Sequence, residues 1–457
     1  MKQTEKTVNQ ITEGIIWKQL LYFFFPILLG TFFQQLYNTA DAMVVGRFVG
    51  KEALACVGGS SSQIINLIVG FFVGLSSGAT VIIAQYYGAR DRERASHIAN
   101  QLIYIVFGIS VVITILVLLL KGPLLRLLFG QVEQTVMAGA ISYFAITALS
   151  YPFIAVYNGG AALFRAMGNS KVSMGISALM NAINIAGNAL CVFGLGMGVE
   201  GVALPSVVSR AVAAVVILLL LRNPRNLVHL EHLFSFRFDP PLMRAILRIG
   251  IPNSLENSVF QLGRVLLVSL ISTFGTVQIA ANAVANNLDN LAIIPGQALG
   301  LAMITVVGQC VGAGDWHQVR QYTKRLLLIA YVFLWCLNIP LLLALPAILD
   351  LYSLSPETWQ YAWLLVMIHN CCAMALWPTS FTLPNALRAA GDVKLPMVVS
   401  IGSMLIFRLG FGIILGVHFQ MGVVGVWIAM IIDWVVRISC FIPRVRKKLW
   451  LEHPPQA

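Results

Sequence analysis

The chain alternates long apolar runs with short polar segments. A dozen of these runs extend for about 20 residues or more, the length at which a helix crosses the hydrocarbon core of a bilayer. We predict membrane-spanning helices over residues 18–44, 54–84, 97–120, 133–157, 172–194, 201–222, 246–273, 279–308, 321–346, 357–383, 396–418 and 422–442. The pattern therefore predicts an all-α integral membrane protein with twelve transmembrane helices.

Composition and charge support this prediction and argue against nucleic-acid binding. Of 457 residues, 58% are hydrophobic and 11% are charged, whereas soluble domains average roughly 25% charged residues. The net charge is +12, but twenty-two of the thirty Lys and Arg lie in segments that this topology places in the cytoplasm, and only four lie in outer loops. This positive-inside bias predicts a multi-pass protein of the cytoplasmic (inner) cell membrane, with both termini in the cytoplasm and the lipid bilayer as its surroundings.

The second half of the chain repeats the first at an offset of 223 to 226 residues. The matching landmarks are Pro26 and Pro252, segments 85–91 and 309–315, segments 164–169 and 387–392, and segments 198–203 and 422–427. An even number of helices per half gives both halves the same orientation in the membrane. We therefore predict two parallel six-helix repeats, an N-terminal lobe (1–222) and a C-terminal lobe (245–457), joined by a cytoplasmic linker (223–244).

Four acids fall in the interior of the predicted spans, away from their first and last residues: Asp41, Glu256, Asp289 and Asp433. A charge inside a bilayer is costly, so each acid is a functional-site hypothesis unless an opposite charge accompanies it. Arg264 lies at the depth of Asp289 on the neighbouring antiparallel span, and Arg408 lies at the depth of Asp433. We predict that these residues form two structural ion pairs.

No comparable partner presents itself for Asp41 or Glu256. An unpaired acid in a span is expected to face a water-filled cavity, where it can bind a proton or a metal cation. Arg210 could reach Asp41 only if spans one and six touch. We therefore predict that Asp41 and Glu256 are the cation-coupling residues.

Polar side chains concentrate in the N-terminal lobe near Asp41. We predict a cavity or substrate-binding role for one tyrosine and five amides: Tyr37, Asn38, Gln63, Asn181, Asn184 and Asn188. Tyr37 and Asn38 precede Asp41 by one turn and share its helix face. Any single amide could instead join helices through a hydrogen bond, but their concentration beside an acid favours a polar cavity.

The residues taken in order resemble the multidrug and toxic compound extrusion (MATE) family. The resemblance rests on Pro26, on Tyr37, Asn38 and Asp41, on Val45-Gly46-Arg47, on the Gln85-x-x-Gly88-Ala89 loop and on the two Arg-Ala-x-Gly turns at 165–169 and 388–392. It covers all twelve spans and implies two lobes around a central cavity. A member of this family exports small amphipathic, often cationic, organic compounds in exchange for protons or sodium ions.

The resemblance also implies site residues and leaves the coupling ion open. It assigns coupling to Asp41 and, in other branches of the family, to a seventh-helix acid that matches Glu256. Asn188 stands where some branches carry a second acid on the fifth helix. His369 and Asn370 stand where others carry an acid on the tenth helix, so neither the proton-type nor the sodium-type site is complete.

Other functions are weighed against efflux. A flippase for lipids or lipid-linked oligosaccharides of the same superfamily would use Arg210, Arg264 and Arg408 to bind a phosphate headgroup. A membrane enzyme is disfavoured because the sequence contains no nucleophile elbow, no phosphate-binding P-loop and no metal-ligand cluster. A passive channel is disfavoured by the two-lobe repeat. We therefore expect no catalytic residue, no metal site and no cofactor, and a monomer.

Overall fold

The computed structural model describes residues 16–44, 60–129, 134–230 and 237–452, and the side chains at 16–19, 38–44, 60–61, 127–129 and 134–136 lie outside the described part. The N-terminal lobe contains α1 (Ile16–Val44), α3 (Ser60–Gly88), α4 (Arg92–Phe129), α5 (Gln134–Ala148), α6 (Tyr151–Ala166), α7 (Ser170–Ala189) with its continuation η2 (Leu190–Gly194), and α8 (Glu200–Leu221). No strand occurs in these segments or in the rest of the described chain.

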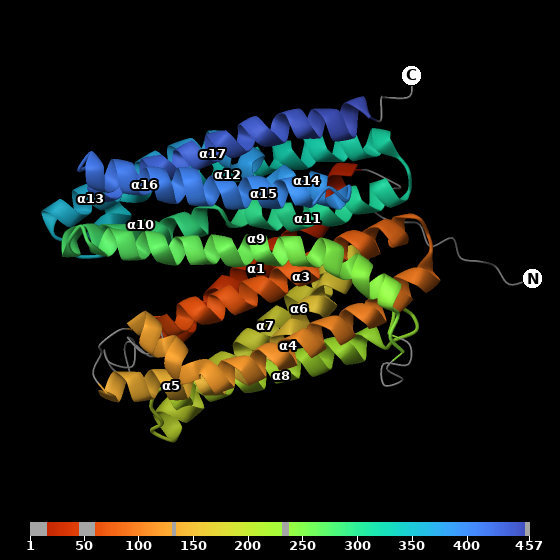
Figure 1. Ribbon diagram of the computed structural model, residues 1–457, viewed down its shortest axis with the longest axis horizontal. Coiled ribbons are helices and arrows are strands. Elements are labelled where there is room, and N and C mark those ends of the chain that lie inside the picture. The colour runs from red at the N-terminus through yellow and green to blue at the C-terminus, as the bar shows by residue number, and fades with distance from the viewer. Residues whose placement is uncertain (1–15, 45–59, 130–133, 231–236, 453–457) are drawn as a thin grey trace, which may run out of the picture.

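The C-terminal lobe repeats this arrangement with more breaks in its helices. It contains α9 (Pro240–Ser272), α10 (Thr276–Ala292), α11 (Ile294–Gly312), α12 (Trp316–Asp350), α13 (Pro356–Trp377), η3 (Pro378–Thr382), α14 (Pro384–Ala389), α15 (Lys394–Gly402), η4 (Ser403–Gly410), α16 (Phe411–Ile413), η5 (Ile414–His418), α17 (Gly422–Val445) and η6 (Arg446–Leu451). Figure 1 shows the two lobes as separate bundles, which approach each other where α1 begins and α17 ends and diverge toward the opposite end.

The predicted all-α membrane fold is confirmed. Ten helices of the described chain are long and apolar enough to span a membrane, or eleven if α5 and α6, bent by 44°, count as one span. Neither α9 nor α10 is among the ten. The helix α9 carries polar residues toward the protein interior and α10 has only 17 residues, but with α11 they occupy the seventh and eighth predicted spans.

The repeated segments 85–91 and 309–315 end in an aspartate that starts the next helix. The Asp91 carboxylate accepts a hydrogen bond from the Arg94 backbone N–H at 3.1 Å, and Asp315 accepts one from Gln318 at 2.9 Å. Each carboxylate thereby satisfies a backbone donor that the first turn of α4 or α12 leaves unpaired. The repeat therefore preserves the turn and the helix start that follows it.

The helices α3 and α9 cross between the lobes at very short range. A Cβ atom on Gly78 would lie 2.5 Å from the Gly250 Cα, and one on Gly74 would lie 2.6 Å from the Ser254 Cα. No real Cβ atom tolerates such distances, so these two positions require glycine. The four-residue glycine spacing in α3 is therefore a packing surface, as Figure 1 shows where α3 and α9 run side by side.

The first turns of α1 and α9 each pack into the core of the other lobe. Leu20, Phe23, Phe24 and Ile27 of α1 belong to a buried cluster with α11, α12 and α17. Conversely, Ile246 of α9 belongs to the buried cluster of the N-terminal lobe. The lobes are thus joined at this end by a reciprocal exchange of helix starts.

Candidate functional site

A cavity of about 450 Å³ lies on the inner face of the C-terminal lobe. Its walls come mainly from α9, α10, α11, α13, α14 and α17, and residues of α1 and α3 form one edge. The residues that α9 contributes recur every three or four positions and therefore share one helix face; they are Asn253, Glu256, Asn257, Phe260 and Arg264. We call this space the C-lobe cavity.

Glu256 is not unpaired, contrary to the sequence-based prediction. The Arg388 Nη2 donates to both carboxylate oxygens of Glu256, at 2.6 and 2.7 Å, and its Nη1 donates to the Asn385 side chain at 2.6 Å. Both side chains of the ion pair are largely buried. Arg388 was missed because it follows the tenth predicted span, in the turn assigned to the cytoplasm, whereas α14 brings its guanidinium into the cavity wall.

Asp289 does not pair with Arg264, so the first predicted ion pair is wrong. The Asp289 carboxylate lies 3.3 Å from the His369 Nδ1, and both side chains are buried. His369 also stands edge-on to Trp434, with ring centroids 5.2 Å apart. Within the described chain, the Arg264 guanidinium makes no hydrogen bond and no ion pair. Equal depth on neighbouring helices did not specify the direction in which each side chain points.

Asp433 pairs within its own helix and not with Arg408, so the second predicted ion pair is also wrong. The Arg437 Nε donates to the Asp433 carboxylate at 2.9 Å, one turn along α17, and the Ser403 hydroxyl donates to the same oxygen. Asp433 and Arg437 side chains are 0% and 2% exposed. The four-residue spacing in the sequence was the signal that could have identified this pair.

Arg408 keeps part of its hydrogen-bonding capacity. Its Nη2 lies 3.1 Å from the Met430 sulfur, a weak acceptor, and its buried Nε has no partner in the described chain. Its guanidinium carbon lies 5.4 Å from the ring centroid of Phe260. Arg264 lies close enough to repel it electrostatically. The C-lobe cavity therefore contains two neighbouring arginines without a carboxylate bonded to either.

Aromatic rings form the remaining wall of the C-lobe cavity. Trp377 stacks on Phe381 with ring centroids 5.1 Å apart, and Phe381 meets both Phe260 and Trp434 edge-on at 6.1 Å. Trp427 adds an edge contact with His369 at 5.7 Å. These rings give the cavity an apolar surface beside its charged groups.

The predicted polar residues of the N-terminal lobe form hydrogen bonds between helices. The Tyr37 hydroxyl lies 3.2 Å from the Ser209 hydroxyl, and Asn184 donates to Ser206 at 3.2 Å and accepts from Asn188 at 3.4 Å. The first two bonds connect α1 and α7 to α8, and the third lies within α7. Tyr37, Asn184 and Asn188 therefore belong to a hydrogen-bonded network at the contact of these helices.

The other predictions in this lobe have separate outcomes. Asn181 donates to the Phe33 carbonyl of α1 at 2.9 Å. Gln63 is partly exposed on α3. Neither residue, nor Tyr37, Asn184 or Asn188, lines the C-lobe cavity. The side chains of Asp41 and Asn38 lie outside the described part of the chain.

Arg210 provides the remaining charge in the N-terminal lobe. Its guanidinium donates to the Ser150 hydroxyl at 2.7 Å and lies over the Tyr37 ring at 5.6 Å. Helices α1 and α8 therefore touch, which was the condition for Arg210 to approach position 41. Among described residues, no group of three His, Cys, Asp or Glu side chains could hold a metal ion.

The lobes are closed against each other where the repeated glutamines meet. Gln85 of α3 donates to the Ala389 carbonyl at 2.7 Å, and Gln309 of α11 donates to the Ala166 carbonyl at 2.6 Å. Gln85 matches Gln309 in the repeat, and Ala166 matches Ala389. Two glycines make this close approach possible. A Cβ atom on Gly312 would lie 2.5 Å from the carbonyl carbon of Gln85, and a Cβ atom on Gly88 would lie 2.7 Å from the carbonyl carbon of Gln309.

We call this contact the interlobe crossing and define it by Gln85, Gly88, Gln309 and Gly312. It explains why the sequence motif Gln-x-x-Gly-Ala occurs once in each half. Each copy contributes a donor to a backbone carbonyl of the opposite lobe and a glycine that admits the opposite glutamine's backbone.

Comparison with known proteins adds a family match in both halves. The family model described as MatE matches residues 26–190 and again residues 252–414. The probable multidrug resistance protein YoeA of Bacillus subtilis is 25% identical over 419 residues, which cover 90% of each chain. The probable multidrug resistance protein NorM of Thermotoga maritima is 25% identical over 427 residues, covering 92% of this chain and 90% of its own.

Solved structures share the fold over nearly the whole chain. An outward-facing multidrug resistance MATE family transporter of the MOP superfamily superposes with a TM-score of 0.89 at 24% identity and covers 98% of this chain and 99% of its own. A crystal structure titled as MATE in the straight conformation gives a TM-score of 0.87 at 25% identity, covering 96% and 98%.

Proposed function

Because the chain belongs to the MatE family of multidrug efflux transporters, we propose that it exports small amphipathic organic compounds in exchange for protons or sodium ions. The observation that carries the proposal is the interlobe crossing, which closes one end of the molecule beside a cavity large enough for a drug-sized ligand. Opening this contact while the lobes meet at the opposite end would give alternating access.

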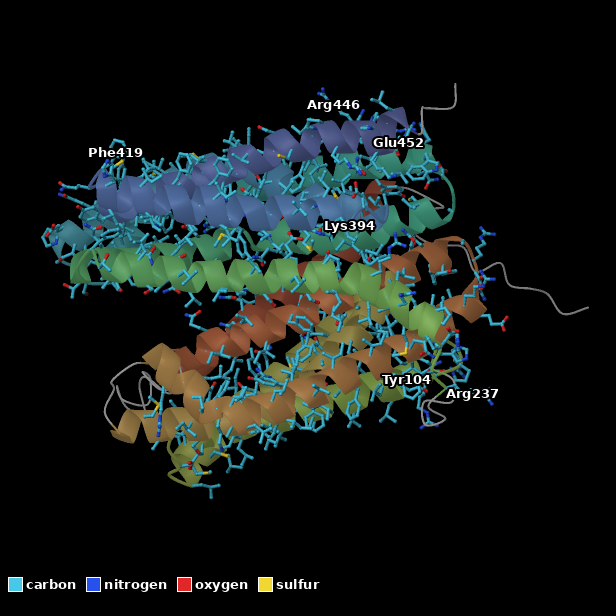
Figure 2. All side chains as sticks on the ribbon, viewed as in Figure 1. Tyr104, Arg237, Lys394, Phe419, Arg446 and Glu452 are labelled. Carbon is cyan, nitrogen blue, oxygen red and sulfur yellow. The ribbon has the colours of Figure 1, made fainter. Side chains whose placement is uncertain are left out.

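We place the interlobe crossing on the cytoplasmic side of the cell membrane. Figure 2 shows Arg237 and Glu452 at one end of the molecule, whereas Phe419 lies at the opposite end. The distribution of Lys and Arg in the sequence favours this end as the cytoplasmic one. The described conformation is then closed to the cytoplasm.

Glu256 is positioned to connect ion binding with the interlobe crossing. Arg388, which binds the Glu256 carboxylate, directly precedes Ala389, whose carbonyl accepts the Gln85 amide. A proton or sodium ion on Glu256 neutralises the carboxylate and weakens its hold on Arg388. The guanidinium is then left largely buried without a counter-charge, which favours movement of α14 and release of Ala389 from Gln85.

Asp41 remains the second proposed coupling residue. Phe33 and Asn181 are hydrogen-bonded neighbours on α1 and α7, and Ser170 of α7 bonds to Phe23 of α1, so the two helices run in parallel. Position 41 lies two turns beyond Phe33, which is the level of Asn188 on α7. An ion at Asp41 would therefore lie beside the amide network of the N-terminal lobe.

Transport by reconstituted protein tests the coupling. In proteoliposomes, imposed proton and sodium gradients should drive efflux of a fluorescent substrate, and collapse of the gradient should stop it. Replacing Glu256→Gln should reduce gradient-driven efflux by about tenfold or more, a coupling of the usual size between two sites, and Asp41→Asn should do the same if the N-terminal lobe takes part.

The matched control is Glu200→Gln. Glu200 is an exposed glutamate at the start of α8 that accepts a hydrogen bond from Ser142 and does not line the C-lobe cavity. Its replacement should leave efflux unchanged. Wild-type gradient dependence in both the Glu256 and the Asp41 variants would contradict the proposed coupling.

A further inference from the structure

The charges of the C-lobe cavity do not balance. Four arginines line it: Arg264, Arg388, Arg408 and Arg437. Two carboxylates, Glu256 and Asp289, line it with them, and a third, Asp433, stands behind Arg437. With His369 neutral, one positive charge remains within the described site, and protonation of His369 would add another.

Two arginines of the site take part in none of its ion pairs. Glu256 is bonded to Arg388, Asp433 to Arg437, and Asp289 is adjacent to His369. Arg264 and Arg408 remain, and the Asp289 carboxylate offsets one of their two positive charges. Asp433 attracts Arg408, whereas the nearby Arg264 and Arg437 guanidinium groups repel it. Mutual repulsion of two cations in a partly dehydrated space is relieved by an anion between them.

We infer that the C-lobe cavity binds the anionic group of an amphipathic organic compound between Arg264 and Arg408. The inference rests on the proposed efflux function and specifies the substrate class. Each guanidinium presents planar N–H donors that match the oxygens of a carboxylate, sulfonate or phosphate. The unpartnered Nε of Arg408 is one donor available for this purpose in the described structure.

The aromatic wall of the cavity indicates what the uncharged part of the ligand should be. Arg408 and Arg437 lie 5.4 and 5.8 Å from the Phe260 ring, and Arg437 lies 4.9 Å from the Phe381 ring. Rings that already face a protein cation offer less attraction to a second cation. They still offer apolar surface to an aromatic ring, so the fitting ligand is a ring system that carries one negative group.

This ligand class differs from the cationic compounds that the sequence resemblance implies. Two of the three acids are bonded to arginines, Glu256 to Arg388 and Asp433 to Arg437. Asp289, beside His369, is the one carboxylate left to attract a cation, against the two arginines that remain for an anion. The two arginines instead match the charge that the flippase alternative required. The chemistry shared by an organic acid and an anionic lipid headgroup is therefore the relevant property.

Two probes with one ring skeleton test the inference. The sulfonate 1-anilinonaphthalene-8-sulfonate and its uncharged counterpart N-phenyl-1-naphthylamine differ by the anionic group alone. Their binding to the full-length protein in nanodiscs of phosphatidylcholine is followed by energy transfer from the cavity tryptophans Trp377, Trp427 and Trp434, with empty nanodiscs as the blank. No ion gradient is applied, so this measurement succeeds or fails independently of the transport assay.

Removal of either arginine should weaken binding of the sulfonate selectively. Arg264→Gln and Arg408→Gln should each raise its dissociation constant about tenfold or more, which corresponds to one charge-assisted hydrogen bond. The dissociation constant of the uncharged probe should change by less than about twofold. Retained binding of this probe also shows that the variant is folded. Arg126→Gln removes an exposed arginine of α4 outside the cavity and should change neither value.

Further variants and lipids complete the test. Arg264→Lys keeps the charge and should retain most of the sulfonate affinity. Phosphatidylglycerol in the nanodisc would compete with the probe if the natural ligand is a lipid headgroup, whereas no competition indicates a soluble organic acid. The inference is overturned if the glutamine variants bind the sulfonate as the wild type does, or if they lose both probes equally.

Discussion

Replacing Gly312→Ala would introduce one methyl group into the interlobe crossing. The new Cβ would lie 2.5 Å from the carbonyl carbon and 2.7 Å from the Cα of Gln85. Both atoms belong to the backbone of a long helix and cannot rotate away. The contact can therefore be accommodated only if α3 and α11 separate.

The size of the effect follows from the geometry. Carbon atoms pack at about 3.5 Å or more, and the Gln85 carbonyl oxygen would lie even closer to the new Cβ than these two carbons. The helices must therefore separate by at least about 1 Å. The hydrogen bonds from Gln85 and Gln309, now 2.7 and 2.6 Å long, would then exceed the range of a hydrogen bond. Each contributes about 1 kcal/mol, and a loss of about 2 kcal/mol changes the ratio of closed to open molecules by roughly 30-fold.

Thiol labelling measures this ratio. Ser77 of α3 lies on the edge of the C-lobe cavity, and Ser77→Cys in a background without the seven native cysteines places one thiol there. A membrane-impermeant maleimide added to inside-out vesicles should label this thiol faster in the Gly312→Ala protein, by up to roughly 30-fold. In right-side-out vesicles the labelling should be slower than in the parent protein.

A second glycine provides the control. A Cβ on Gly108 of α4 would have no atom within 4 Å, so Gly108→Ala should leave both labelling rates unchanged. If Gly312→Ala labels at the parental rate on both sides while its unfolding temperature is unchanged, then the close approach of α3 and α11 does not determine which side is closed, and the reasoning fails.

Two further predictions concern stability in detergent. Asp433→Asn leaves the Arg437 guanidinium buried without its counter-charge and should lower the free energy of unfolding by about 3 kcal/mol or more. Asp392→Asn, which breaks the more exposed ion pair with Arg444, should lower the free energy of unfolding by less than about 1 kcal/mol. If both variants lose the same free energy of unfolding, burial does not explain the loss in Asp433→Asn. Tyr37→Phe removes the hydroxyl that meets Ser209 and should cost about 0.6 kcal/mol in thermal unfolding while leaving efflux unchanged; lost efflux in a stable protein would instead indicate a substrate-binding role.

The fold could be predicted from the sequence because its determinants are periodic. Apolar runs of spanning length and landmarks that recur at one offset specify the helices and the two halves. The exchange of helix starts between the lobes was not predictable in this way. Nothing in the apolar face of Phe23 and Phe24 distinguishes a partner in α7 from one in α12, since both helices present apolar side chains.

The ion pairs show where sequence reasoning reached its limit. Depth along a span correctly placed Arg408 near Asp433, and it brought Arg264 and Asp289 to the walls of one cavity. Depth does not give the rotation of a helix about its axis, and a pair across helices depends on that rotation. Arg437, by contrast, lies one turn from Asp433 on one helix, where the spacing alone fixes the contact.

The exchange of helix starts also sets the order in which the protein is completed during synthesis. The Phe24 ring lies 4.9 Å from that of Phe333, and the same cluster includes Phe441, Val445 and Leu449 near the other end of the chain. A ribosome adding 5–20 residues each second needs roughly 20–80 s to reach these residues after Phe24. The start of α1 can contact α7 earlier, through Ser170 and the Phe23 carbonyl. The ring of Phe24 must be covered by lipid until its partners in the C-terminal lobe have been made, so the packing of α1 is completed late.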